Sequence, residues 1–181
     1  MVMKKASKSN NYKILSAVLA LALVIVLVYV FLPAFFYNSL ATVVLPQLST
    51  NGFVKTTVNA SVVDQNTASI TLSAECYGLT AAVEPTEAQS VIDGMNNQVG
   101  PRPNAHDLVR DVFSALKINV LMVKITQRQD SIYLAKIVLR QGNTILNYDI
   151  RPADGIAIAV RTKAPIYMNE TLLKTDGTKI C

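Results

Sequence analysis

The twenty residues YDIRPADGIAIAVRTKAPIY, Tyr148–Tyr167, contain the end of one predicted strand, a complete predicted helix and the start of another strand. Apolar and polar residues alternate up to Ile150, which is the pattern of a half-buried strand. Pro152 ends that strand because it lacks a backbone N–H, and its fixed φ suits the first turn of a helix. The apolar residues that follow recur at helical spacing, so one helix face is expected to be buried. The junction between strand and helix is polar and contains Arg151 and Asp154.

Further strands and helices are predicted on the N-terminal side of this junction. Alternating patterns predict strands over residues 53–63, 68–74, 76–83, 118–126, 131–141 and 144–150. Helical spacing predicts one helix that begins at Pro85 and a second helix with Asn104 as its N-cap. The inner face of the second helix is expected to contain Leu108, Val109, Val112, Phe113 and Leu116. This order of elements predicts an α+β fold, a mainly antiparallel sheet with two or three packed helices.

Several short blocks in this region resemble the signature of the bifunctional nuclease (DNase/RNase) domain family. The blocks near the junction are Arg151-Pro152-Ala153-Asp154-Gly155, Ala159-Val160-Arg161 and Ala164-Pro165-Ile166-Tyr167. The earlier blocks are Glu87-Ala88-Gln89, Arg102-Pro103 and His106-Asp107-Leu108. Their order and spacing agree with the family over roughly residues 76–174. The resemblance implies a nuclease that cleaves DNA or RNA.

Two residues depart from the family signature. Ala153 stands where the family usually has Ser, and the change removes a hydroxyl that could cap the helix or contact a ligand. Gly155 stands where the family usually has Ala, and glycine inside a helix costs about 1 kcal/mol. Both departures weaken the activity that the resemblance implies.

The positive charge of the chain is concentrated near its N-terminus. The whole chain has a net charge of +5, but four of its 17 basic residues are Lys4, Lys5, Lys8 and Lys13. The rest of the chain has 13 basic and 12 acidic residues, so its net charge is +1. All 12 acidic residues lie beyond residue 60. Nucleic-acid backbones are bound by clustered Lys and Arg. Overall charge therefore gives little support to nucleic acid as a partner, although a local basic patch remains compatible with it.

An apolar segment follows these lysines. Ile14–Leu32 has no charged residue and would span about 28 Å as a helix, close to the thickness of a bilayer core. The positive-inside rule then predicts a basic cytoplasmic N-terminus over 1–13 and a transmembrane signal anchor over 14–37. A cleaved secretory signal is the alternative. We expect a linker over 38–52, and a domain over 53–181 that lies outside the cytoplasm on a single-pass cell-membrane protein, with the lipid bilayer as a partner.

Six polar residues on or beside two predicted helices are the candidate site. We expect them to line one cleft if the helix starts converge: His106, Asp107, Asp111, Arg151, Asp154 and Arg161. Phosphodiesterases commonly use carboxylates that hold a metal ion. The metal would be Mg²⁺ or Mn²⁺, with Asp107, Asp111 and Asp154 as its ligands. The structural alternative is that the acids favour helix dipoles and the arginines form ion pairs.

The single histidine and the two cysteines limit the chemistry. His106 is the only histidine, so a metal site with two histidines is excluded within one chain. Cys76 and Cys181 lie in no C-x-x-C pattern, which argues against zinc. The two cysteines could form a disulfide in an oxidising compartment or remain free thiols, and the sequence does not decide between these states.

Two functions follow as hypotheses. The first is a membrane-anchored nuclease that hydrolyses DNA or RNA phosphodiester bonds with metal assistance. The second is a non-catalytic binding or structural subunit of a cell-envelope membrane complex that keeps the family fold. In the second case the partners would be other membrane proteins, in a homo- or hetero-oligomer.

Overall fold

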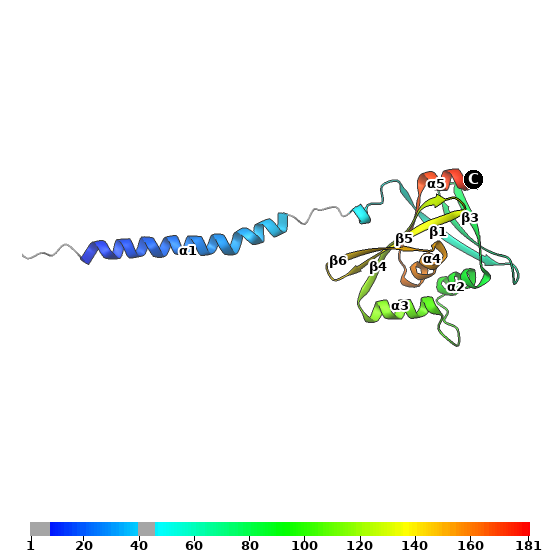
Figure 1. The fold of residues 1–181 in the computed structure, drawn as a ribbon, viewed down its shortest axis with the longest axis horizontal. Coiled ribbons are helices and arrows are strands. Elements are labelled where there is room, and N and C mark those ends of the chain that lie inside the picture. The colour runs from blue at the N-terminus through cyan, green and yellow to red at the C-terminus, as the bar shows by residue number, and fades with distance from the viewer. Residues whose placement is uncertain (1–7, 40–45) are drawn as a thin grey trace, which may run out of the picture. The chain divides into compact units, whose positions relative to one another are not determined.

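The computed structural model describes residues 8–39 and 46–181. The chain divides into two compact units, Met1–Leu45 and Pro46–Cys181. The first unit contains the helix α1, Lys8–Ser39 (Figure 1).

The structure does not support the predicted transmembrane anchor. Among the described residues, no helix is long and apolar enough to cross a membrane. The predicted anchor covered residues 14–37, and the side chains from 30 to 37 lie outside the described residues. Residues 1–7 of the predicted basic N-terminus and 40–45 of the predicted linker also lie outside them.

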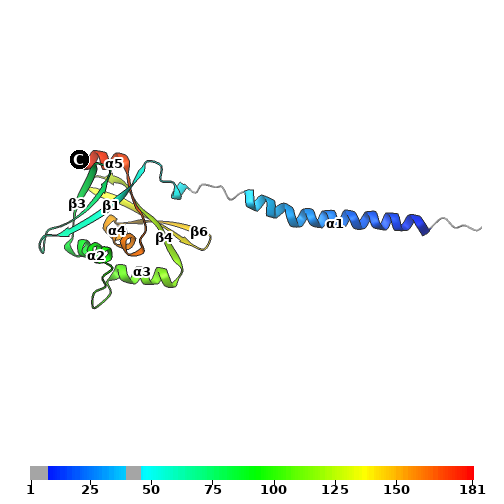
Figure 2. The same ribbon diagram turned by 180° about the vertical axis from the view of Figure 1, so that it is seen from behind.

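The second unit is an α+β domain with one eight-stranded sheet (Figures 1 and 2). The strands are β1 Phe53–Val62, β2 Ala68–Ala74, β3 Tyr77–Val83, β4 Ile118–Gln129, β5 Ile132–Gln141, β6 Thr144–Ile150, β7 Ile166–Asn169 and β8 Thr178–Lys179. The helices are the 3₁₀ turn η1 Pro46–Leu48, α2 Pro85–Met95, α3 Ala105–Ala115, α4 Pro152–Thr162 and α5 Glu170–Asp176. Within residues 46–181 the sheet order is β6-β5-β4-β7-β1-β2-β3-β8, and only the β4–β7 pair is parallel. The predicted α+β class and mainly antiparallel sheet are confirmed.

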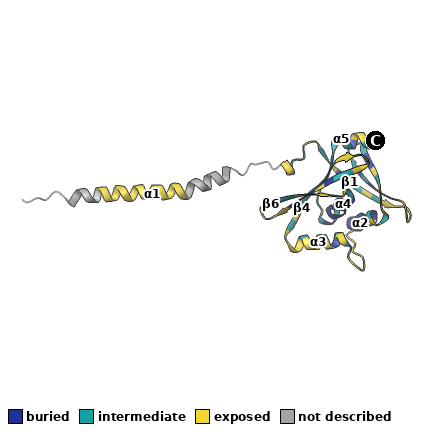
Figure 3. Cartoon of the chain, viewed as in Figure 1, coloured by how far each residue is buried: buried dark blue, intermediate teal, exposed yellow. Residues whose placement is uncertain are grey.

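Helix α4 is the central helix of the domain. It packs on β4 and β5, and α2 and α3 pack against it in turn. Most of its residues from Ala153 to Arg161 are buried, as the dark blue segments of Figure 3 show. Pro152 occupies the first helical turn, as the sequence predicted, and the left-handed Lys163 ends the helix. Of the charged residues of α4, Arg161 is buried among the three helices, whereas Asp154 is partly exposed.

Gly155 allows α4 to approach the sheet closely. A Cβ atom at this position would lie 3.0 Å from Cγ1 of Val123 and 3.2 Å from Cγ2 of Ile150. Such distances are tighter than ordinary packing contacts, so the backbone of α4 lies closer to β4 than an alanine would permit without adjustment. The loss of helix propensity expected for this glycine is thus accompanied by closer packing between helix and sheet.

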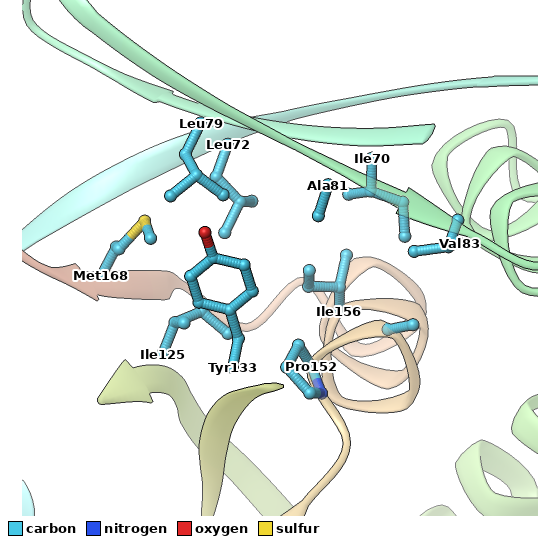
Figure 4. A pocket seen from close by; sticks show the side chains of 11 residues that line it. Ile70, Leu72, Leu79, Ala81, Val83, Ile125, Tyr133, Pro152, Ile156 and Met168 are labelled. Atoms are coloured by element: carbon cyan, nitrogen blue, oxygen red, sulfur yellow. The ribbon is translucent and has the colours of Figure 1, made fainter. Parts of the chain in front are cut away.

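A small apolar cavity lies between α4 and the sheet (Figure 4). Its volume is about 40 Å³, and Ile156, Ile125 and Met168 are among the side chains around it. The ring of Tyr133 also lines it, while the Tyr133 hydroxyl donates to Asp176. No charged side chain lines this cavity, so it is a packing void of the core and not a polar site.

The apolar face predicted for α3 is confirmed only in part, because Val109 and Phe113 pack against the core while the other three residues are exposed. Leu108 is 61% exposed, Val112 42% and Leu116 54%, while Val109 and Phe113 are half-buried. Helical spacing identifies an apolar face but does not say what covers it. In this domain α3 contacts the core through Val109 and Phe113, and Asp107 in its first turn is buried against α4.

Residues just before β1 are fixed to the centre of the sheet through Lys124. Its Nζ donates to the carbonyl oxygens of Gln47 and Ser49 and lies 5.2 Å from the centre of the Phe53 ring. Burial lowers the pKa of Lys124 below its usual range. Residues 46–52 of the predicted linker thus pack with the compact unit.

The two cysteines form a disulfide, which decides the alternative that the sequence left open. Cys76 and Cys181 are joined across a sequence separation of 105 residues. The backbone N–H of Ile180 donates to the Cys76 carbonyl, and β8 pairs with β3 at Tyr77 and Gly78. The C-terminus is therefore attached to the edge of the sheet both covalently and by hydrogen bonds.

Candidate functional site

The first turns of α2, α3 and α4 each contain an acid as their third residue. These acids are Glu87, Asp107 and Asp154. An acid at this position is favourable because the N-terminal end of a helix has a partial positive charge. Side chains connect the three turns: Arg151 contacts both Glu87 and Asp154, and His106 contacts Asp154. We call these turns and the residues that connect them, among them Arg161 from the last turn of α4, the helix-start cluster. Its members are Glu87, Ser90, Asn104, His106, Asp107, Arg151, Asp154 and Arg161.

The inner half of the helix-start cluster is a buried ion pair. Nε of Arg161 donates to Oδ1 of Asp107 at 2.7 Å, and both side chains are 2% exposed. Nη1 of Arg161 also donates to the carbonyl oxygens of Ser90 and Ala157. Oδ2 of Asp107 accepts from the backbone N–H of Asn104, which completes a capping box at the start of α3. Arg161 thus connects α2, α3 and α4.

The ionised form of Asp107 is stabilised despite its burial. Burial alone raises the pKa of this carboxyl. The hydrogen bond from Arg161, the N–H of Asn104 and the positive charges of Arg161 and Arg110 outweigh burial, so the pKa of Asp107 is below its usual value. The ion pair is therefore charged at neutral pH, and its contacts suit a structural role.

The outer half of the cluster reaches solvent. Arg151 is 70% exposed, and it donates to Oδ2 of Asp154 at 2.6 Å and to Oδ1 at 3.0 Å. Nε2 of His106 lies 3.1 Å from Oδ1 of Asp154, and Nδ1 of His106 lies 2.9 Å from Oγ of Ser90. Asn104 donates to the same Ser90 oxygen at 3.2 Å. The result is a continuous chain of polar groups from the surface to the buried ion pair.

Arg151 strongly affects the acidity of Asp154. Burial raises the pKa of Asp154, but hydrogen bonds from Arg151 and His106, together with their charges, lower it below the usual value. The carboxylate in turn raises the pKa of Arg151. A ligand that took Arg151 away from Asp154 would remove the main influence that lowers this pKa.

The structure brings together five of the six predicted site residues, and Asp111 is the exception. Asp111 is 58% exposed and pairs with the neighbouring Arg110 on the surface of α3. Asp107 and Asp154 belong to different halves of the cluster and bind different arginines. In the part of the chain that the structure describes, no group of three or more His, Cys, Asp or Glu residues is placed to hold a metal ion. The three predicted metal ligands therefore do not lie together as one set in this arrangement.

Sequence reasoning missed three members of the cluster as site residues. Glu87 was noted only as part of the family resemblance, although an acid three residues into a predicted helix could have been counted with Asp107 and Asp154. Asn104 was predicted only as an N-cap. Ser90 gave no signal, because a single serine inside a predicted helix has many explanations.

The outer half of the cluster lies beside an open groove of about 760 Å³. Glu87, Asp149 and Arg151 are the charged residues that line it. Ala81–Val83 of β3 and residues 131–135 at the start of β5 form other parts of the wall. This is the hollow through which a ligand would reach Arg151.

A sequence model of the bifunctional nuclease domain matches residues 72–180, which is more than half of the chain and includes the whole helix-start cluster. The chain belongs to the bifunctional nuclease domain family. The family resemblance noted over residues 76–174 is thereby confirmed. Within this bifunctional nuclease domain, Arg151 is the N-cap of α4 and Ala153 is its second residue. The serine that the family usually has at 153 would therefore not be the N-cap in this structure.

Several curated proteins are similar to part of the chain. Bifunctional nuclease 1 of Arabidopsis thaliana is 32% identical over 108 residues, which is 57% of this chain and 33% of that protein. Bifunctional nuclease 2 of Oryza sativa subsp. japonica is 31% identical over 81 residues, 43% of this chain and 25% of that protein. An uncharacterised protein of Mycobacterium tuberculosis is 35% identical over 80 residues, 44% of this chain and 47% of that protein. The chain thus spans between a quarter and a half of these relatives.

Proposed function

We propose that this domain binds nucleic acid and hydrolyses its phosphodiester bonds at the outer half of the helix-start cluster. The observation that carries the proposal is that Arg151, which lines an open groove, also binds Asp154, and that Asp154 in turn contacts His106. An exposed arginine suits a phosphate, because its planar guanidinium can form two parallel hydrogen bonds with phosphate oxygens. The names of the plant relatives support the same reaction class.

In this proposal Asp154 is the general base, and a hydrogen bond from His106 holds its carboxylate in position. The Ser90 oxygen already accepts from Asn104, so its own hydrogen is available for Nδ1 of His106. Nε2–H of His106 then donates to Oδ1 of Asp154. This arrangement holds the carboxylate in place while its other oxygen, Oδ2, is paired with Arg151.

Substrate binding would make Asp154 more basic. A substrate phosphate that binds Arg151 competes with the carboxylate for the guanidinium, and the pKa of Asp154 then rises towards its usual value. Oδ2 is free to take a proton from water as the water oxygen attacks phosphorus. The bond between phosphorus and the leaving oxygen breaks, and that oxygen takes a proton from solvent. Asp154 would thus be activated only when the substrate is present.

The requirement for Mg²⁺ or Mn²⁺ remains a prediction. A divalent cation could neutralise phosphate charge and activate water. The residues described do not present a three-ligand set, so the roles above use only the protein's own side chains. Each cation is therefore included as a separate condition in the assay that follows.

We expect Arg151→Met and Asp154→Ala each to lower the rate of hydrolysis by about 100-fold or more, as loss of a phosphate-binding or acid–base group commonly does. The assay measures cleavage of single- and double-stranded DNA and RNA in EDTA, Mg²⁺ or Mn²⁺. Glu170→Gln on α5, away from the cluster, is the control and should keep full activity. Undiminished cleavage by the Asp154→Ala, His106→Ala double variant would exclude this site. A folded wild-type chain without activity in any condition would exclude the function.

We also propose that the domain works in an oxidising compartment, outside the cytoplasm. The Cys76–Cys181 disulfide supports this location, because disulfides persist mainly in secreted and extracytoplasmic proteins. The lysines at the N-terminus agree with a cytoplasmic start of a membrane-anchored chain. The oxidation state of the two cysteines in the cell is the measurement that tests the location.

A non-catalytic binding subunit is the second candidate, and the surface of α3 favours it. Leu108, Val112 and Leu116 form an exposed apolar stripe at four-residue spacing. A helix face of this kind is usually covered by another protein surface. For an oligomer through α3, the wild-type chain should be larger than a monomer by light scattering, and Leu108→Asp with Leu116→Asp should return it to a monomer. A wild-type monomer without co-purifying proteins would contradict this reading.

A further inference from the structure

A second groove lies at the C-terminal end of α4. Its volume is about 480 Å³, within the range of roughly 300–1,000 Å³ that is typical of ligand pockets. It is lined by residues 55–58 of β1, by Met95 at the end of α2 and by the connection from α4 to β7. The family-signature block Ala164–Tyr167 covers the end of this connection and the start of β7, and the helix-start cluster does not use that block.

The charge of this groove is positive. Lys55 and Lys163 line it, and no Asp or Glu is among the lining residues. Both lysines are exposed. In the described part of the chain neither of them forms an ion pair with a carboxylate, whereas Lys136 and Lys174 do. The two ammonium groups are therefore available to an anionic ligand.

The other lining residues suit a nucleotide chain. Tyr167 pairs with Lys55 across β1 and β7, so an aromatic ring and a cation come from adjacent positions of neighbouring strands. Met95 is 42% exposed and adds an apolar surface together with Pro165. Sites for single-stranded nucleic acid commonly combine cations along the backbone with aromatic or apolar surfaces for the bases.

We propose that this groove binds the phosphate backbone of a single nucleic-acid strand, several nucleotides away from the bond cleaved at Arg151 and Asp154. The inference rests on the proposed function, because it assigns the substrate class of the same domain. At 1.5 Å per residue, Lys163 lies about 14 Å from Asp154 along α4. A strand that kept the spacing of about 3.4 Å per nucleotide found in a duplex would cover that distance in about four nucleotides. Short oligonucleotides would therefore reach one region, and longer strands would reach both.

The test is the salt dependence of binding to a labelled oligothymidylate, measured by fluorescence anisotropy with the full chain in EDTA. Each lysine that contacts phosphate contributes about 0.7 to the slope of log K against log salt for a single strand. We expect Lys55→Gln and Lys163→Gln each to lower the slope by about 0.7, and the double variant by about 1.4. Lys117→Gln is the matched control, since Lys117 is also an exposed lysine with a positive φ after a helix and without an ion pair among the described residues. Its slope should equal that of the wild type.

A second variant separates binding from folding. Lys163 has a φ of 58°, where glycine is favoured over other residues, so Lys163→Gly should keep or raise the melting temperature while it lowers the slope. Equal slopes for the wild type and the double variant would overturn the proposal, as would a wild type that binds no oligonucleotide. Lysine-dependent binding without cleavage would support the groove and count against only the hydrolytic function. If the chain cleaves nucleic acid but the lysine variants keep the slope of the wild type, the hydrolytic function would be supported and the groove proposal would be overturned.

Discussion

Replacement of Arg161 by Met is expected to lower the free energy of unfolding by about 3–5 kcal/mol. The substitution keeps an unbranched apolar side chain but leaves the carboxylate of Asp107 buried without its partner. It also removes a donor from the carbonyl oxygens of Ser90 and Ala157. A charge left alone in the interior is costly because water no longer solvates it. The measurement is urea unfolding followed by circular dichroism.

The controls for this prediction use a surface pair and a double variant. Lys174→Met breaks the exposed pair with Glu170, and exposed pairs contribute only about 0–1 kcal/mol. Arg161→Met combined with Asp107→Leu removes both charges, so it should recover part of the loss seen in Arg161→Met alone. A single variant as stable as the wild type would show that Arg161 is not the connection that the geometry indicates.

The same ion pair gives the direction of the pH dependence. The folded-state pKa of Asp107 is lowered, so the unfolded chain binds a proton more readily. The stabilisation is complete above the unfolded value of about 4 and is lost as the pH falls through the lower folded value. The pKa of Asp154 is lowered too and contributes in the same direction. We expect Asp107→Asn to show a shallower loss of stability in acid than the wild type.

Reduction of the Cys76–Cys181 disulfide is expected to lower the free energy of unfolding by about 2–5 kcal/mol. The bond closes a loop of about a hundred residues, and a loop of this length strongly restricts the unfolded chain. Dithiothreitol should lower the urea midpoint of the wild type but leave the Cys76→Ser, Cys181→Ser variant unchanged. Hydrogen exchange should be faster at Ile180 after reduction, since its N–H bonds to Cys76 at the attached end. The same midpoint with and without reductant would contradict the prediction.

The state of the two cysteines in the cell tests where the domain is located, and it is measured by alkylating free thiols. If the domain is outside the cytoplasm, alkylation of acid-quenched cells should leave both cysteines unmodified unless a reductant is added first. Free thiols at Cys76 and Cys181 in intact cells would place the domain in a reducing compartment and would count against the proposed location.

Local sequence signals predicted the regular elements well. Pro152 at the start of a helix and Asn104 as an N-cap both depend on the local backbone, and the structure has them where they were expected. Such signals are reliable because the competing conformations are sterically or electrostatically unfavourable for those residues. Six members of the helix-start cluster lie in the family blocks, and the other two, Ser90 and Asn104, do not.

Long-range relations were not readable from the sequence alone. His106 and Asp154 are 48 positions apart, and Asp107 and Arg161 are 54 apart, so their contacts depend on how three helices pack. Spacing grouped Asp107 with Asp111 on one helix, yet the third residue of a helix faces its neighbours here while the seventh faces solvent. The sequence identified the acids and arginines that could pair. It did not show that the Asp107–Arg161 pair would be buried and structural, or that Arg151, the partner of Asp154, would reach the groove.

The contact of Lys124 with the carbonyls of Gln47 and Ser49 has a mechanical consequence. Any pulling force applied to the chain ahead of residue 46 meets this attachment before it reaches the hydrogen bonds between β1 and β7. The load passes to β4, which lies between β5 and β7 inside the sheet. Traction on the N-terminal side is thus resisted at β4, inside the sheet, and the neighbouring strand β5 lines the groove beside Arg151.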